Sequence, residues 1–342
     1  MRRWNDLTEV PPGLSGSVVT IGVFDGVHRG HQHVIGRAVE RAREAGVPAV
    51  VLTFDPHPMT VVRPELAPPM LATLDHRLEL FERYGADAAL VMPFTSQRSQ
   101  QPAEEFVRET AGVLRPRAIV VGDDFRYGHR AAGDVALLET LGAELGFAVE
   151  GLPRDEGNAD WSSTSVRKAL EVGDVRAAAD LLGHLFRVDG VVVRGAGRGG
   201  PVLGTPTANI PVEHGRAVPA DGVYAAWAVR LDDPERTRMP AATSVGTNPQ
   251  FGEEPRQVEA YIVDREGLDL YGVALGVEFV ERVRGQATFE SLDDLRAAIR
   301  RDVERIRDIL GIETSPMNTV DDTADDTVDD TAARPAARRP TE

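Results

Sequence analysis

The sequence predicts an α/β domain with a doubly wound parallel sheet, followed by a small all-β domain. The chain has 342 residues, enough for about two domains of ordinary size. From about Ser17 to Gly183, short apolar runs alternate with amphipathic stretches, which is typical of a parallel sheet with helices on both faces. From about His184 onward, turn residues separate the apolar runs with little helix between them. That pattern is typical of a small antiparallel barrel or sandwich.

The elements of the first half follow from apolar runs and helical spacing. The predicted strands are Val18–Phe24, Ala49–Phe54, Ala88–Phe94, Ala118–Val121 and Phe147–Leu152. A helix lies between the first two strands and ends at Gly46, because its apolar residues recur at helical spacing: Val34, Ile35, Ala38, Val39, Ala42 and Ala45. Three further helices are expected at His76–Tyr84, Ala103–Leu114 and Val135–Leu145.

The sequence of the second half predicts mainly strands. These are Phe186–Val193, Gly222–Val229, Ala241–Val245, Val258–Val263 and Val273–Val280. One helix closes the region at Leu292–Leu310, with Ser291 as its N-cap and Asp294 in its first turn. After Ile312 the chain contains the acidic repeat TVDDTADDTVDDT, which is too polar to pack. We therefore predict domains at 1–183 and 184–312 and a disordered acidic tail at 313–342.

Composition excludes several classes of function. The chain has no cysteine, which excludes a disulfide framework, a zinc ribbon, an iron–sulfur cluster and a thiol nucleophile. Its net charge of −16 argues against nucleic acid or an anionic membrane as partner. Lys168 is the only lysine, so no Walker A motif is present. The amino terminus carries no secretory signal and no apolar run is long enough to span a bilayer, so we expect a cytoplasmic protein.

The segment with the most candidate functional residues is TIGVFDGVHRGHQHVI. Its pattern predicts a strand, a turn and the start of a helix near His31. His28 and His31 then lie at a helix N-terminus, where the dipole favours anions, and Gly26 and Gly30 allow a phosphate to approach the backbone. Two imidazoles there can stabilise charge on a transferring phosphoryl or nucleotidyl group. Alternatively, the histidines are surface loop residues, or they form a metal site with His33, which should point away from His31 within a helix.

Other unusual residues follow neighbouring strands of the predicted sheet. His57 lies between two prolines that should hold it in an extended loop, and Asp124 lies in the segment GDDFRYG. Carboxyl ends of parallel strands meet at one edge, where such sheets bind ligands. The segment SSTSVR opens a further helix, and its hydroxyls serve either as an ordinary N-cap or, with Ser163, Thr164 and Arg167, as phosphate contacts.

A second candidate site lies in the all-β half. The glycine-rich segment GVVVRGAGRGGPVLGTPTANI ends in a predicted turn, where the Thr207 hydroxyl and the Asn209 amide can bind a metal–phosphate complex. The alternative is a flexible hairpin. Glu259 lies on a predicted strand, with Val258 and Ala260 facing the opposite side. Its carboxylate can accept the proton of a substrate hydroxyl, or it is simply a solvent-facing strand residue.

Four segments, in this order, closely resemble the adenylyltransferase half of the prokaryotic bifunctional riboflavin kinase/FAD synthetase: GVFDGVHRGH, TFDPHP, VGDDFRYG and SSTSVR. Five later segments are similar to the riboflavin kinase module: PTAN, DGVY, SVGTNP, VEAYIVD and DLYG. The resemblance covers about residues 15–310. It implies a Rossmann-like nucleotidyltransferase domain at 1–183 and a six-stranded Greek-key β-barrel kinase domain at 184–312. Riboflavin and ATP would give FMN, and FMN and ATP would give FAD and pyrophosphate.

The resemblance also implies roles for individual residues. His28 and His31 would contact the ATP phosphates and stabilise the transition state, and Glu259 would act as base on the riboflavin 5′-hydroxyl. Mg²⁺ would be bound with ATP by Thr207 and Asn209. The nucleotide- and flavin-binding residues would be Gly22, Phe24, Asp25, Gly30, His57, Asp124, Ser163, Thr164, Arg167, Gly195, Thr207 and Asn209.

The sequence departs from the family pattern at Thr205, which stands between Gly204 and Pro206 where an aromatic residue is usual. This departure keeps open an enzyme that adenylylates FMN but has an impaired kinase module. A rival from another class is a flavin-binding or flavin-sensing protein without turnover. The intact His28, His31 and Glu259 argue against that rival, because a protein that only binds flavin does not need them.

Overall fold

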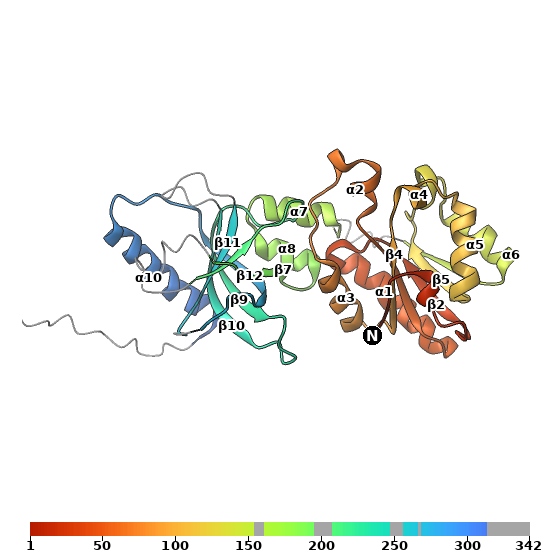
Figure 1. Cartoon of the computed structure of the whole chain (residues 1–342), viewed down its shortest axis with the longest axis horizontal. Coiled ribbons are helices and arrows are strands. Elements are labelled where there is room, and N and C mark those ends of the chain that lie inside the picture. The colour runs from red at the N-terminus through yellow and green to blue at the C-terminus, as the bar shows by residue number, and fades with distance from the viewer. Residues whose placement is uncertain (154–160, 195–206, 247–255, 266–267, 313–342) are drawn as a thin grey trace, which may run out of the picture. The chain divides into compact units, whose positions relative to one another are not determined.

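The computed structural model describes residues 1–153, 161–194, 207–246, 256–265 and 268–312. The predicted acidic tail, Gly195, Thr205 and most of the segment SVGTNPQFG lie outside the described residues. Figure 1 shows the helices and strands of the described ranges, with the first sheet in red to yellow and the second in green to blue.

The first sheet is parallel throughout, and its order is β1-β4-β3-β2-β5-β6. The strands are β1 (Arg2–Trp4), β2 (Ser17–Ile21), β3 (Ala49–Asp55), β4 (Ala88–Pro93), β5 (Pro116–Gly122) and β6 (Ala148–Leu152). From β2 the chain adds β3 and β4 on one side, and later β5 and β6 on the other. The direction of winding therefore changes beside β2, which is where ligands bind in open α/β sheets. The predicted doubly wound sheet is confirmed.

Helices cover both faces of this sheet. The longer ones are α1 (Arg29–Ala45), α3 (Leu74–Arg83), α5 (Ala103–Leu114) and α6 (Val135–Leu145). Alternate residues of β3 enter different cores: Ala49 and Val51 pack with residues of α1 and α3, whereas Val50 and Leu52 pack with residues of α5 and α6. This alternation follows from the period of two along a strand. Short helices α2 (Pro58–Val62) and α4 (Ser96–Ser99) follow β3 and β4.

Two more helices, α7 (Ser163–Glu171) and α8 (Val175–Leu182), come before the second sheet. Ser162 is the N-cap of α7 and its side chain accepts a hydrogen bond from the amide of Ser165, as the hydroxyl-rich sequence predicts. The sequence pattern did not predict α8. It ends at Gly183, whose φ of +72° is the left-handed conformation that commonly ends a helix.

The second sheet has six antiparallel strands in the order β7-β12-β9-β10-β11-β8. They are β7 (Phe186–Val191), β8 (Thr207–Pro211), β9 (Gly222–Arg230), β10 (Arg238–Gly246), β11 (Gln257–Ile262) and β12 (Ala274–Arg284). A bridge between Val193 and Asn209, in which the Val193 amide donates to the Asn209 carbonyl at 2.9 Å, joins the chain after β7 to β8. The first and last strands of the order therefore meet, which confirms the predicted barrel-like sheet.

Two predictions about the second half have different outcomes. The helix α10 (Leu292–Leu310) has the predicted bounds and the predicted Ser291 N-cap. The turn expected at Pro-Thr-Ala-Asn is wrong, because Thr207–Pro211 forms β8 and pairs with β11 along five residues. Small and polar residues suggested a turn, but the ladder to β11 satisfies their backbone groups in an extended conformation.

Candidate active sites on the two sheets

The turn after β2 has an unusual backbone. Phe24 has φ +53°, Gly26 +75° and Val27 +42°, so three of four residues are in the left-handed region. That conformation is costly for Phe24 and Val27, and it persists only where packing determines it. Phe24 is 3% exposed and Val27 is fully buried. The predicted strand Val18–Phe24 therefore ends early, at Ile21, and the chain turns sharply into α1.

His28 and His31 form a stacked pair at the start of α1. Their ring centroids are 3.6 Å apart with an angle of 23° between the planes. His28 is the N-cap of α1, and its Nδ1 accepts a hydrogen bond from the amide of His31 at 3.4 Å. A neutral His28 with this bond carries its proton on Nε2. Burial, together with the nearby His28, holds the pKa of His31 well below its usual range, so that His31 is neutral at pH 7.

The geometry of the described residues favours neither of the two alternatives for these histidines. His28 is 7% exposed, which rules out an ordinary surface loop residue. In the part of the chain that the structure describes, no group of three histidine, cysteine or acidic side chains could hold a metal ion. His33 is exposed on α1 and does not share the stacked arrangement.

Glycines shape this site by leaving room for side chains. A Cβ on Gly30 would lie 3.2 Å from the His28 ring, and one on Gly22 would lie 2.9 Å from the Phe24 ring. A Cβ on Gly26 would lie 3.0 Å from Leu71. The small size of Gly26 therefore serves the packing of the turn, whereas Gly30 lets His28 fold back over the helix N-terminus.

Asp25 is buried and its carboxylate is occupied by protein groups. It accepts hydrogen bonds from the amides of Leu71, at 3.0 Å, and Ala72, at 3.3 Å, and it forms an ion pair with Arg167 of α7. Burial raises the pKa of Asp25, although the nearby Arg167 opposes this effect. The Ser163 hydroxyl donates to the carbonyl of Asp25 at 2.9 Å. Asp25 therefore joins the turn to α7, a connection that the sequence analysis did not foresee.

Two of the remaining predicted residues, His57 and Asp124, follow the carboxyl ends of β3 and β5 in the same sheet. His57 has an extended backbone (φ −56°, ψ 132°), as the flanking prolines predict, and it is the N-cap of α2. Burial, with the charges of Arg167 and Arg77, lowers its pKa to about 4. Asp124 is exposed just after β5, and Thr164 is exposed on α7. Because β3 and β5 are the two neighbours of β2, the residues that follow these strands converge around the turn.

Sequence reasoning missed Arg77 on α3, which is 1% exposed. Its guanidinium donates to the carbonyl of Val23 at 2.8 Å, to the hydroxyl of Thr53 at 3.1 Å and to the carbonyl of Phe54 at 3.4 Å. One arginine therefore joins the ends of β2 and β3 immediately before their functional loops. A signal was present, because Arg77 lies three residues from Leu74 and four from Phe81, on the buried stripe of the helix.

We expect Arg77→Met to lower the free energy of unfolding by about 3 kcal/mol, because buried carbonyls that lose their donor each cost about 1–3 kcal/mol. Urea unfolding followed by fluorescence and circular dichroism measures the change. The matched control is Arg83→Met on the exposed side of the same helix, which should change stability by less than about 0.5 kcal/mol. Equal effects of the two substitutions would contradict the role assigned to Arg77.

The second site lies on β8 and β11, where Asn209 is the direct cross-strand partner of Glu259. Val258 and Ala260 are fully buried in the barrel core, so Glu259 faces the other side of the sheet, as predicted. Asn209 is 6% exposed, and its amide nitrogen donates to the carbonyl of Thr207 at 3.2 Å. A carboxylate and two neutral oxygen-bearing side chains therefore share one face of two paired strands.

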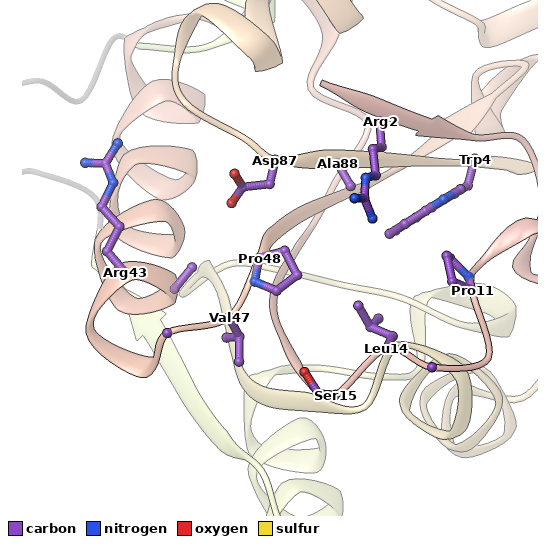
Figure 2. A pocket seen from close by; sticks show the side chains of 13 residues that line it. Arg2, Trp4, Pro11, Leu14, Ser15, Arg43, Val47, Pro48, Asp87 and Ala88 are labelled. Atoms are coloured by element: carbon purple, nitrogen blue, oxygen red, sulfur yellow. The ribbon is translucent and has the colours of Figure 1, made fainter.

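A separate hollow lies at the amino ends of the parallel strands, opposite the carboxyl ends that carry the histidine pair (Figure 2). Its volume is about 700 Å³, and it is lined by residues before or at the amino ends of the strands, among them Arg2, Ser15, Pro48 and Asp87. The histidine pair follows a carboxyl end, so this hollow is not part of the site described above. Within the described ranges, no helix has the length and apolar character needed to cross a membrane.

Comparisons with known proteins match both halves of the chain. A family model described as FAD synthetase matches residues 11–165, and one described as riboflavin kinase matches residues 182–310. The bifunctional riboflavin kinase/FMN adenylyltransferase of Escherichia coli K12 is 34% identical over 314 residues, which cover 91% of this chain and 98% of that protein. The protein of the same name from Pseudomonas fluorescens is 38% identical over 304 residues, which cover 88% and 95%.

A solved structure supports the fold across both sheets. It comes from Streptococcus pneumoniae and is described as a macrolide-efflux protein. Its sequence is 30% identical, the TM-score is 0.76, and the superposition covers 89% of this chain and 98% of that one.

Proposed function

The chain belongs to the family of bifunctional riboflavin kinases/FMN adenylyltransferases, and from this premise we propose which residues carry out each of its two reactions. It phosphorylates riboflavin to FMN and adenylylates FMN to FAD. The observation that carries the assignment of the adenylyltransferase site is the stacked His28–His31 pair at the N-terminus of α1, beside the point where the sheet changes its direction of winding. ATP, riboflavin and FMN are the proposed small-molecule partners.

In adenylyl transfer, a phosphate oxygen of FMN attacks the α-phosphorus of ATP, and the bond to the departing pyrophosphate breaks. Negative charge develops on the phosphate oxygens in this step, and donors already held in place stabilise it. The Nε2–H of His28, a ring N–H of neutral His31 and the free amides of α1 supply such donors. Arg167 is a further source of positive charge, although its guanidinium is held in the ion pair with Asp25 of the same turn.

In the kinase reaction, the 5′-hydroxyl of riboflavin attacks the γ-phosphorus of ATP, ADP leaves, and the hydroxyl proton must be accepted. We assign this proton to the carboxylate of Glu259, which faces away from the barrel core beside Asn209. We also propose that the other residues implied by the family resemblance, Gly195 among them, contact flavin or nucleotide, and that the protein is cytoplasmic.

The residues of the kinase site fit a magnesium ion bound together with ATP. Mg²⁺ prefers oxygen ligands and is usually held by one or two protein groups, substrate phosphates and water. The Thr207 hydroxyl and the Asn209 carboxamide oxygen match this donor set, because the Asn209 amide nitrogen is the atom that donates to Thr207. When bound, the ion would neutralise phosphate charge during transfer.

We expect removal of divalent metal with EDTA to abolish both products, and we expect added Mg²⁺ to restore them. Asn209→Ala should raise the Mg²⁺ concentration needed for FMN formation severalfold and leave the requirement for FAD formation unchanged. Titration of Mg²⁺ in separate assays of the two reactions measures this. An unchanged requirement in the variant would remove Asn209 as a metal ligand.

The test of the function as a whole is chromatography of the flavins after the purified protein is incubated with riboflavin, ATP and Mg²⁺. FMN and FAD are both expected. If riboflavin stays unchanged while added FMN becomes FAD, the kinase module is impaired, as Thr205 suggests. If neither flavin reacts, the chain only binds flavin.

A further inference from the structure

The turn Asp25–Val27 has three consecutive carbonyl groups that are each held by a side chain. The Ser163 hydroxyl donates to the carbonyl of Asp25 at 2.9 Å. Nε2 of His184 lies 3.1 Å from the carbonyl of Gly26, and Nε2 of Gln32 donates to the carbonyl of Val27 at 2.7 Å. A carbonyl can only accept, so this contact is a hydrogen bond in the tautomer that carries the ring proton on Nε2.

These bonds meet a definite need of the turn. The turn is buried, and its left-handed residues keep it from continuing as a strand or as a regular helix. Buried carbonyls without a partner destabilise the conformation that exposes them. The three donors therefore stabilise the conformation that places His28 and His31 at the start of α1.

The donors come from three different parts of the chain. Gln32 lies on α1 and also donates to the carbonyl of Leu182, so it links the turn to the end of α8. His184 lies between α8 and β7, inside the range matched by the riboflavin kinase model and outside the range matched by the FAD synthetase model. At least one residue that holds the adenylyltransferase turn, His184, therefore lies beyond residue 165, where the FAD synthetase match ends.

We propose that Gln32 and His184 are positioning residues for FAD formation, which hold the turn that presents His28 and His31. This inference rests on the proposed function, because it takes the histidine pair as the adenylyltransferase site. His184 belongs by sequence to the kinase region, and yet we expect its substitution to impair FAD formation and to leave FMN formation intact.

The ring of His184 also has Nδ1 3.0 Å from the carbonyl of Leu185. A neutral ring has one N–H and can serve only one of the two carbonyls, whereas a protonated ring serves both. Two amide substitutions separate these contacts. The Gln side chain places its N–H near the position of Nε2, and the shorter Asn side chain places it near that of Nδ1. Only His184→Gln should therefore preserve the bond to Gly26.

The test measures kcat and KM for FAD formation from FMN, and for FMN formation from riboflavin, in the full-length protein. We expect His184→Ala to reduce kcat for FAD formation about 10- to 100-fold, because small displacements of catalytic groups have effects of this size. FMN formation should stay within twofold. His184→Gln should recover most of the loss and His184→Asn should not. Gln32→Glu keeps the shape but replaces the donor with an acceptor, and it should match the loss in His184→Ala.

The exposed His214 provides a matched control, since His214→Gln should change neither reaction. Normal FAD formation in His184→Ala and Gln32→Glu would overturn the inference. Rescue by Asn as good as rescue by Gln, or rescue by neither, would also overturn it, because the bond to Gly26 would not be the cause. His28→Ala in the same assays keeps the two hypotheses apart: FAD formation that survives this substitution overturns the proposed function itself.

Discussion

His28→Ala and His31→Ala are each expected to abolish FAD formation in an ordinary assay and to leave FMN formation from riboflavin intact. Loss of one positioned donor to a developing negative charge typically lowers kcat by about 10²–10³-fold. The two rings stack at 3.6 Å, so removal of either one also leaves the other without the neighbour that orients it. Glu259 and Asn209 belong to the other sheet, so the kinase reaction should not change. Separate assays started from FMN and from riboflavin measure the two rates.

His33→Ala is the matched control, because His33 is an exposed histidine on the same helix. It should retain both activities. Equal loss of FAD and FMN formation in His28→Ala would mean that the two reactions are assigned to the wrong regions. Normal FAD formation in both His28→Ala and His31→Ala would remove the stacked pair from the catalytic site.

Local patterns in the sequence were enough to predict the elements that nearby residues determine. The bounds of Ala103–Leu114, Val135–Leu145 and Leu292–Leu310 were predicted correctly, because their apolar spacing is a local signal. The last two helices are also flanked by a capping side chain and a terminal glycine. β8 was missed because an extended Thr207–Pro211 depends on its pairing with β11, about fifty residues later in the chain. Arg2–Trp4 was missed for the same reason, since its charged residues form a strand only against β4.

In the candidate sites, too, features set by local pattern were predicted and features set by tertiary contacts were not. A strand followed by a turn and a helix placed His28 and His31 at a helix N-terminus, and alternation along a strand placed Glu259 opposite the barrel core. The partners of Asp25 could not be predicted, because Leu71 and Arg167 approach it only in the folded chain. Nor does a local pattern predict the left-handed conformation of Phe24, which tertiary packing imposes on the turn.

Glu259→Gln is expected to have the opposite effect to the histidine substitutions: FMN formation should fall and FAD formation from added FMN should stay normal. The amide keeps the size of the side chain beside Asn209 but cannot take the proton of the riboflavin hydroxyl. Loss of a general base typically costs about 10²–10⁴-fold in rate.

The fall in FMN formation should appear in kcat more than in the KM for riboflavin, because the proton is transferred only in the reaction step. Glu235→Gln, an exposed glutamate between β9 and β10, is the control and should leave both reactions unchanged. Normal FMN production by Glu259→Gln would remove this residue as the base. A parallel loss of FAD formation would instead show that the barrel strand supports both sites. The assignment of the two reactions to separate sites is therefore tested by Glu259→Gln as directly as by the His28 and His31 substitutions.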